Sequence, residues 1–169
     1  MTALRPIEPA DVEALERWKT DPAAAGDHQW FGFMPRRLRE QVEHGTLIGE
    51  EGGSLAVVDD DGALVGDVSW RRRVTGPGPH NHSWNLGIML LPEHRGRGHG
   101  TAAQRQLAAY LFAHTAVERV EADTDVANVA EQRALEKAGF TREGVLRRAQ
   151  FREGAWHDMV LYSKLRGER

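Results

Sequence analysis

The 169-residue sequence predicts an α/β fold: a single domain over residues 1–169, with one mixed sheet and helices on both of its faces. Segments with strand-type and helix-type periodicity alternate along the chain. A strand–helix–strand unit lies in the middle and predicts parallel strands, whereas tight turns elsewhere predict antiparallel ones. The expected order of elements is β-α-α-β-β-β-α-β-α-β-β.

The first half of the chain predicts three strands and two helices. Apolar residues at helical spacing, namely Val12, Leu15 and Trp18, indicate the first helix. Pro35 is typical of a helix start, and a turn at 61–62 (Asp-Gly) is typical of a hairpin. The expected elements are a strand at 2–7, a helix at 9–20, a loop at 26–35, a helix at 35–44 and two strands within 54–73.

The second half of the chain predicts the strand–helix–strand unit, one more helix and a final hairpin. Pro92 ends the central strand, and Gly139 is the usual left-handed residue after a helix. A turn at 153–154 (Glu-Gly) joins the last two strands. The expected elements are a loop at 75–83, a strand at 84–91, a helix at 100–115, a strand at 119–125, a helix at 128–140 and a hairpin at 141–165.

The composition is that of an ordinary soluble protein. Hydrophobic residues make up 40% and charged residues 28%, and the net charge of -3 gives no general attraction for nucleic acid. The sequence has no cysteine, which excludes disulfides, thiol nucleophiles and thiolate metal sites. Because no long apolar run suggests a signal peptide or a membrane span, we expect a cytoplasmic protein with no membrane partner.

A glycine-rich stretch, HRGRGHGT at 94–101, lies between the central strand and a helix. Glycines at Gly96, Gly98 and Gly100 let several N–H groups converge at the positive end of the helix dipole. Such a point binds anions, most often phosphate, and Arg95 and Arg97 can add charge-assisted contacts. The alternative is a strand–helix turn that binds nothing.

The details of this stretch exclude two common phosphate sites. No Lys-Ser/Thr pair follows the last glycine, which argues against a nucleotide-hydrolysing P-loop. The spacing is GxGxG, and no acidic residue follows a second strand in the dinucleotide-binding manner. The expected ligand therefore bears phosphate but is neither a hydrolysed triphosphate nor a nicotinamide cofactor.

Three segments resemble the GNAT superfamily of N-acetyltransferases. The stretch RGRGHGT at 95–101 resembles the pyrophosphate loop of acyl-CoA in that superfamily, with Arg95, Gly98 and Gly100 at its fixed positions. The segment DVANVAEQRALEKAGF at 125–140 is similar to the Asn-x-x-Ala/Ser…Glu-Lys-x-Gly-Phe pattern of the superfamily. The opening LRPIEPADVEAL and the tail from 143 to 165 resemble the RimJ/RimL branch, so the likeness covers nearly the whole chain.

The resemblance implies a GNAT-type fold with a splayed central strand pair and acetyl-CoA as co-substrate. It places Ile88, Met89 and Leu90 along the pantetheine arm, and it lets Asn128 touch the cofactor. From the residues alone, Asn128 has a second role as an N-cap, with Glu131 as its capping-box partner. Main-chain groups of the loop would hold the pyrophosphate: Arg95, Gly96, Arg97, Gly98, His99, Gly100 and Thr101.

The implied reaction is direct attack of a primary amine on the acetyl thioester in a ternary complex. The amine must first lose a proton, and the oxyanion needs donors, for which the N–H of Met89 is expected. The chain departs from the family at three positions. Asn85 stands where many relatives have Glu, Leu135 where many have Tyr, and Glu131 where some have Ser, so no catalytic residue carries over directly.

Two carboxylates remain as catalytic candidates. Glu131 lies one helical turn after Asn128 and could act as acid or base near the sulfur; the alternative is the capping box. Asp67 lies on a strand beside the acceptor side, and the alternative is a solvated strand residue.

The acceptor side is expected among aromatic residues and near the central strand. The candidates for substrate contact are Trp30, Phe31, Trp84 and Asn85, with core packing as the alternative for each aromatic ring. His80 and His82 form an H-x-H pattern in the loop at 75–83, but no third ligand accompanies them, so no metal is expected.

The expected partners are acetyl-CoA and an amine, either a protein N-terminus or a small molecule. A non-catalytic acyl-CoA-binding module is one alternative, because the usual Glu and Tyr are missing. A ribosome- or RNA-associated accessory protein is another, resting on the arginine runs at 36–39 and 70–73. A homodimer is possible because dimers are common among relatives.

Overall fold

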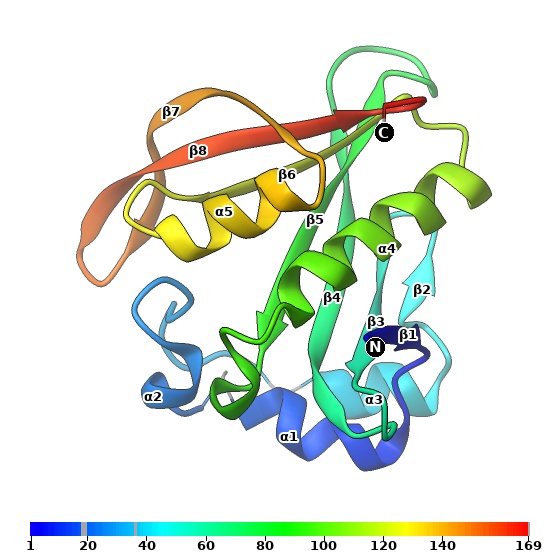
Figure 1. Ribbon diagram of the computed structural model, residues 1–169, viewed down its shortest axis with the longest axis vertical. Helices are drawn as coiled ribbons and strands as arrows, with labels where there is room; N and C mark the ends of the chain where they lie inside the picture. Colours follow the sequence, from blue (N-terminus) through cyan, green and yellow to red (C-terminus); the bar gives the residue numbers. More distant parts are fainter. Residues whose placement is uncertain (18–19, 36, 169) are drawn as a thin grey trace.

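The structure is a computed structural model that describes residues 1–17, 20–35 and 37–168. It has one eight-stranded sheet in the order β1-β3-β4-β5-β6-β8-β7, with β2 paired to β3 (Figure 1). The strands are β1 Ala3–Arg5, β2 Ile48–Gly49, β3 Gly52–Val58, β4 Leu64–Val74, β5 His82–Leu90, β6 Arg119–Asp125, β7 Thr141–Arg152 and β8 Ala155–Leu165.

The helices lie on both faces of the sheet, as the alternating pattern predicts. They are α1 Val12–Glu16, α2 Pro22–Ala25, α3 Leu38–Glu43, α4 His99–His114 and α5 Val129–Lys137, with 3-10 turns at Pro9–Asp11 and Pro92–His94. Figure 1 shows α4 and α5 crossing one face of the sheet, while α1 and α3 lie near the lower end of β3 and β4 in this view. None of the helices in the described ranges is long and apolar enough to cross a membrane.

The sheet is mixed, which confirms the predicted fold class. The β5–β6 pair is parallel because α4 connects these strands, and the other strand pairs of the described chain are antiparallel. The parallel pairing covers three positions, from Trp84–Val120 to Leu86–Ala122. Beyond Leu86 the two strands separate, which confirms the splayed central pair.

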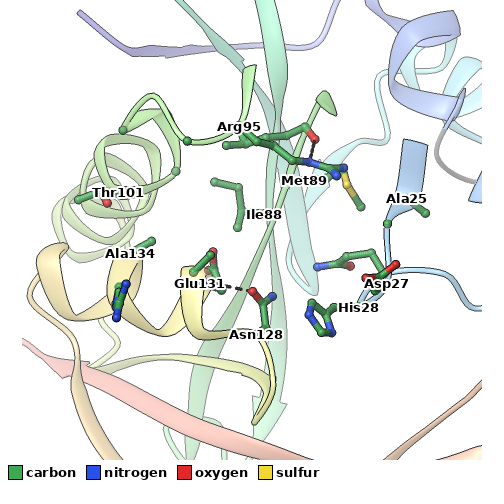
Figure 2. A pocket seen from close by; sticks show the side chains of 18 of the residues that line it. Ala25, Asp27, His28, Ile88, Met89, Arg95, Thr101, Asn128, Glu131 and Ala134 are labelled. Carbon is green, nitrogen blue, oxygen red and sulfur yellow. Dashed lines mark hydrogen bonds between the residues drawn. The ribbon is translucent and has the colours of Figure 1, made fainter. Parts of the chain in front are cut away.

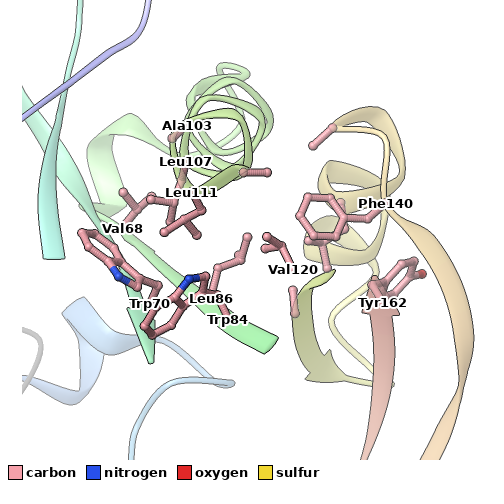
Figure 3. Packing of buried hydrophobic residues seen from close by; sticks show 14 of the residues in the cluster. Val68, Trp70, Trp84, Leu86, Ala103, Leu107, Leu111, Val120, Phe140 and Tyr162 are labelled. Atoms are coloured by element: carbon pink, nitrogen blue, oxygen red, sulfur yellow. The ribbon is translucent and has the colours of Figure 1, made fainter. Parts of the chain in front are cut away.

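Two apolar clusters hold the layers together. The larger one packs α4 and α5 on the sheet, with Leu107, Leu111 and Tyr162 fully buried (Figure 3). The smaller cluster packs α1 and α3 on the opposite face around Leu15 and Ala56. Each buried leucine contributes about 1.5–3 kcal/mol, so both clusters fix the strands from which the site is built.

Several expected boundaries shift by a few residues. The helix expected at 9–20 begins as a 3-10 turn, and Trp18, which the helical spacing included, lies outside the described residues. The helix expected at 35–44 begins at Leu38, and Arg36 of the first arginine run also lies outside the described residues. The short α2 and β2 were not expected: Asp21 caps α2 by accepting a 3.0 Å bond from the N–H of Ala23.

The entry into α4 depends on a left-handed glycine. Gly98 is the N-cap residue with φ +86°, a conformation that costs other residues about 1–2 kcal/mol. Gly98→Ala should therefore lower the free energy of unfolding by that amount, measured by urea denaturation. Gly100→Ala is the control, because a Cβ there meets only ordinary contacts from 3.6 Å outwards, and it should cost no stability. Equal effects of the two substitutions would contradict this role of Gly98.

Candidate active site

A cleft of about 710 Å³ opens where β5 and β6 separate. Its walls are the end of β5, the start of α4, one face of α5 and the segment after α2 (Figure 2). Many residues predicted from the sequence line it together: Ile88, Met89, Leu90, Arg95, Gly96, Gly98, Gly100, Thr101, Asn128 and Glu131. The helix start and the splayed strands therefore face one common space.

The glycine loop presents the start of α4 to the cleft. Gly96 and Gly98 have φ of +74° and +86°, and no side chain caps the helix. The first-turn amides and the helix dipole are thus available to an anion. Arg97 and His99 do not line the cleft; the Nδ1 of His99 lies 3.0 Å from the Oγ1 of Thr2 instead.

The Arg95 side chain is engaged with main-chain carbonyls. Its Nε donates to the oxygen of Leu90 at 3.0 Å, and its Nη2 donates to the oxygen of Ala24 at 2.6 Å. It thereby ties the end of α2 to the end of β5 across the cleft. Gly26 leaves room for it, because a Cβ there would lie 3.1 Å from Nη1. The expected charge-assisted phosphate contact of this side chain is therefore replaced by a structural one.

The main chain of Met89 faces β4, although its side chain lines the cleft. A Cβ at Gly66 on β4 would collide with the carbonyl oxygen of Met89, so this oxygen faces β4. Two residues further along the chain, the N–H of Leu91 donates to the carbonyl oxygen of Val65 at 2.9 Å and therefore also faces β4. Since main-chain groups alternate in direction along a strand, Ile88 and Leu90 face the opening. The main chain of Met89, where the oxyanion donor was expected, is therefore directed toward β4 and away from the opening.

Asn128 caps α5, as its own chemistry predicts. Its Oδ1 accepts a 3.2 Å bond from the N–H of Glu131 (Figure 2). In a capping box the Glu131 carboxyl would accept a bond from the N–H of Asn128. Here that N–H donates to the carbonyl oxygen of Asp125 at 2.9 Å instead. The carboxyl of Glu131 therefore faces the cleft and Gln104 of α4 rather than closing the cap.

Burial raises the pKa of Glu131 to about 7, while the neighbouring Gln104 amide opposes the shift. The physical cause is the cost of placing a charge between two helices and an apolar strand end. A carboxyl in this range is protonated in about half of the molecules at neutral pH and exchanges its proton readily there, which is the property of a general acid or base.

Two cationic residues of α5, Arg133 and Lys137, line the cleft but were not predicted from the sequence. They lie four residues apart on one helix face, next to Ala130 and Ala134, whose small side chains leave space for a ligand. In the sequence, this spacing of two small residues beside two cations could have identified Arg133 and Lys137 as candidate site residues.

The segment after α2 closes the cleft opposite α5 with its residues Asp27 and His28, of which sequence reasoning did not single out His28. The oxygen of His28 accepts a 3.2 Å bond from Nη1 of Arg152, which is 3% exposed. Nη2 of Arg152 pairs with Asp125 at 2.5 Å. Burial disfavours the charge of Asp125, but the N–H of Ala127 and this guanidinium outweigh it and keep its pKa below the usual value.

The other predicted site residues lie outside the cleft lining. Asp67 lines a separate hollow of about 510 Å³ below α3, that is, between α3 and the strands β3 and β4. There its Oδ2 accepts a 3.2 Å bond from Ser54. Phe31 is largely exposed, and Trp30 packs edge to face on Phe33 with ring centroids 5.4 Å apart.

Trp84 and Asn85 are both buried on β5, on opposite faces. Trp84 packs in the larger core and donates from Nε1 to Thr115 at 3.1 Å, so the expected acceptor contact is replaced by core packing (Figure 3). Strand alternation turns its apolar ring toward α4. Asn85 faces the other side and bonds to Arg71 and Asp123.

A mixed sheet whose central parallel strands part beside a glycine-rich helix start defines the N-acyltransferase class of fold. A model of the GNAT acetyltransferase domain matches residues 2–141. The Bacillus subtilis protein named "Putative ribosomal N-acetyltransferase YdaF" is 32% identical over 175 residues, covering 98% of this chain and 91% of that protein. This chain belongs to the GNAT acetyltransferase family.

Solved structures share the fold at low identity. The spermidine N-acetyltransferase of Vibrio cholerae, in complex with CoA and spermine, has a TM-score of 0.80 at 19% identity, covering 99% of this chain and 96% of that one. Mycobacterium smegmatis RimJ, in complex with CoA-disulfide, has a TM-score of 0.76 at 24% identity, covering 98% and 82%.

The raised pKa of Glu131 predicts a pH dependence of stability. The folded chain keeps a proton up to about pH 7, while the unfolded chain releases it near the ordinary value of 4.5. This stabilising contribution is complete below pH 4.5 and is lost as the pH rises to 7 and above. Urea unfolding between pH 4.5 and 8 should show this loss in the wild type and a flatter profile in Glu131→Gln. Glu13→Gln, at an exposed position of α1, should keep the wild-type profile; an unchanged slope in Glu131→Gln would contradict the assignment.

Proposed function

We propose that this protein transfers the acetyl group of acetyl-CoA to a primary amine by direct attack in a ternary complex. The observation that carries the proposal is the cleft in which the uncapped start of α4 meets the end of β5, beyond the point where β5 parts from β6. A helix start binds phosphate, and a parted strand pair offers main-chain groups to an extended, amide-bearing chain. Coenzyme A has both of these features.

The cleft fits that co-substrate in size and in charge. Its volume of about 710 Å³ falls within the usual range for ligand sites. The amides at 96–101 suit the pyrophosphate, and the freed edge of β5 suits the pantetheine arm. Arg133 and Lys137 would contact the remaining phosphate on the ribose. The Vibrio and Mycobacterium structures named above contain CoA or its disulfide, which supports this assignment.

The residues of this chain can serve each step of the transfer. Acetyl-CoA supplies an activated thioester. The ammonium group first gives a proton to water, and the free amine nitrogen attacks the carbonyl carbon to form the C–N bond. The C–S bond then breaks, the nitrogen loses its second proton to water, and the sulfur leaves as a thiolate that takes up a proton. The N–H groups of Ile88 and Leu90 face the opening and would stabilise the oxyanion. Glu131, whose pKa is raised to about 7, would supply the proton to the thiolate from its protonated form.

Two kinds of acceptor are compatible with this cleft: the N-terminus of a protein and a small amine. The named relatives include a protein described as a ribosomal acetyltransferase and a spermidine acetyltransferase, so they support both.

The direct test is a thiol-release assay with acetyl-CoA and a panel containing spermidine, simple alkylamines and peptides with a free N-terminus. The proposal predicts saturable release with at least one amine and a mass increase of one acetyl group on it. Binding of acetyl-CoA without release for any amine would favour the non-catalytic module, and absence of binding would contradict the proposal.

Removing the two positive charges of α5 should show which phosphate of the co-substrate they contact. The double variant Arg133→Gln/Lys137→Gln should weaken acetyl-CoA binding about tenfold by calorimetry, since two solvent-accessible charge-assisted contacts are lost. The affinity for 3′-dephospho-acetyl-CoA should change much less. Arg39→Gln, on α3 at the other face of the sheet, is the matched control. Equal losses for both nucleotides would contradict the assignment of these side chains.

A further inference from the structure

The face of β6 turned away from α4 carries three alternating carboxylates. Val120 and Ala122 point into the core, so Glu121, Asp123 and Asp125 point to the opposite face. Glu121 and Asp125 are 4% exposed, whereas Asp123 is partly exposed.

Arginines neutralise two of these carboxylates but not the third. Glu121 lies 2.8 Å from Nη1 of Arg73 and 2.5 Å from Nε of Arg119. Asp125 pairs with Arg152. Within the described chain, Asp123 has no ion pair at 4.0 Å or less. The one hydrogen bond that its carboxylate accepts from the described side chains comes from a neutral group, Nδ2 of Asn85, at 2.8 Å.

Asn85 fixes the orientation of Asp123. Its Oδ1 accepts a 3.2 Å bond from Nε of Arg71, so the amide nitrogen must face Asp123. Asn85 thereby holds the Asp123 carboxylate by one oxygen, Oδ1. The Arg71 guanidinium bonds to Asn85, which lies between it and the carboxylate. Asn85, the middle member of this chain of hydrogen bonds, is 5% exposed, whereas Arg71 is exposed and Asp123 is partly exposed.

Asp123 also lies where the strands part. Ala122 is the last β6 residue paired with β5, so Asp123 is the first residue beside the opening. Across from it, Gly87 carries no side chain on the same face of β5, and Oγ of Ser69 on β4 lies 3.1 Å from where its Cβ would be. Met89, two residues further on this face, lines the cleft. Asp125, two residues or about 7 Å further, meets Arg152, which holds the cleft residue His28.

From this arrangement we infer that Asp123 binds the ammonium group of the acceptor amine. A carboxylate without its own cation, fixed at the opening and on the face away from the start of α4, selects a positively charged primary amine over neutral nucleophiles. This assignment rests on the proposed function and deepens it, because it explains which property the two kinds of acceptor share: an ammonium group at neutral pH.

Asp123→Asn tests the charge without disturbing the geometry. The new amide keeps an oxygen that accepts from Asn85, so the melting temperature and the affinity for acetyl-CoA should stay at wild-type values. The KM for the best amine of the panel should rise at least about tenfold, the loss of one charge-assisted contact. High salt should raise the wild-type KM but leave that of the variant nearly unchanged.

Two further variants separate charge from structure. Asp123→Glu keeps the charge and should recover most of the amine affinity. Glu118→Gln, an exposed carboxylate just before β6, should behave as the wild type. A KM within twofold of the wild type in Asp123→Asn would overturn the inference, and so would equal losses in the Asn and Glu variants, which would indicate a structural role.

A binding measurement keeps this inference distinct from the proposed function. Spermidine and a tetrapeptide with a free N-terminus are titrated by calorimetry into wild type and Asp123→Asn, each saturated with CoA. Binding that depends on Asp123 supports the inference even if no amine is acetylated. Acetylation with the same amine binding in both proteins overturns the inference while leaving the proposed function intact. If neither amine binds the wild type, the inference fails.

Discussion

The separation of β5 from β6 after three paired positions is the constraint on which the rest of the site depends. Up to Leu86 the two strands form an ordinary parallel pair beneath α4 and α5. Beyond it, a row of main-chain groups on β5 loses its partner strand, and such groups require another partner or water. The cleft, the helix start and the acidic face of β6 all meet at this opening, so a failure of the strands to part would remove the site.

Much of the positive charge around the opening serves structure rather than ligand binding. Arg95 joins the end of α2 to β5. Arg152 joins β7 to the segment at His28 through one hydrogen bond and to β6 through a buried ion pair with Asp125. Removing one partner of such a buried pair leaves an uncompensated charge, which is strongly destabilising. The groups proposed above to contact ligands are the amides of the loop, the two cations of α5, Glu131 and the Asp123 carboxylate of β6.

The order of elements could be predicted because each rests on local signals: the hairpin turn at Gly154, the cap at Gly139 and the glycine entry into α4 all lie where expected. The contents of the cleft were only partly predictable. The direction of a main-chain group at Met89 depends on the register with β4, and the fate of the Arg95 side chain depends on α2, which is remote in sequence. For Trp84 the sequence left substrate contact and core packing open, and strand alternation, which decides the face that a ring covers, places it in the core.

The central claim is that coenzyme A binds with its pyrophosphate on the main-chain amides before α4. It is tested most directly by NMR, following the backbone amides of the ¹⁵N-labelled protein as acetyl-CoA is added. The account predicts the largest shifts at Gly96, Gly98 and Thr101, with further shifts at Ile88 and Leu90 and none beyond noise at the hollow below α3. Shifts centred on that hollow, or none at the glycine loop at saturating acetyl-CoA, would contradict it.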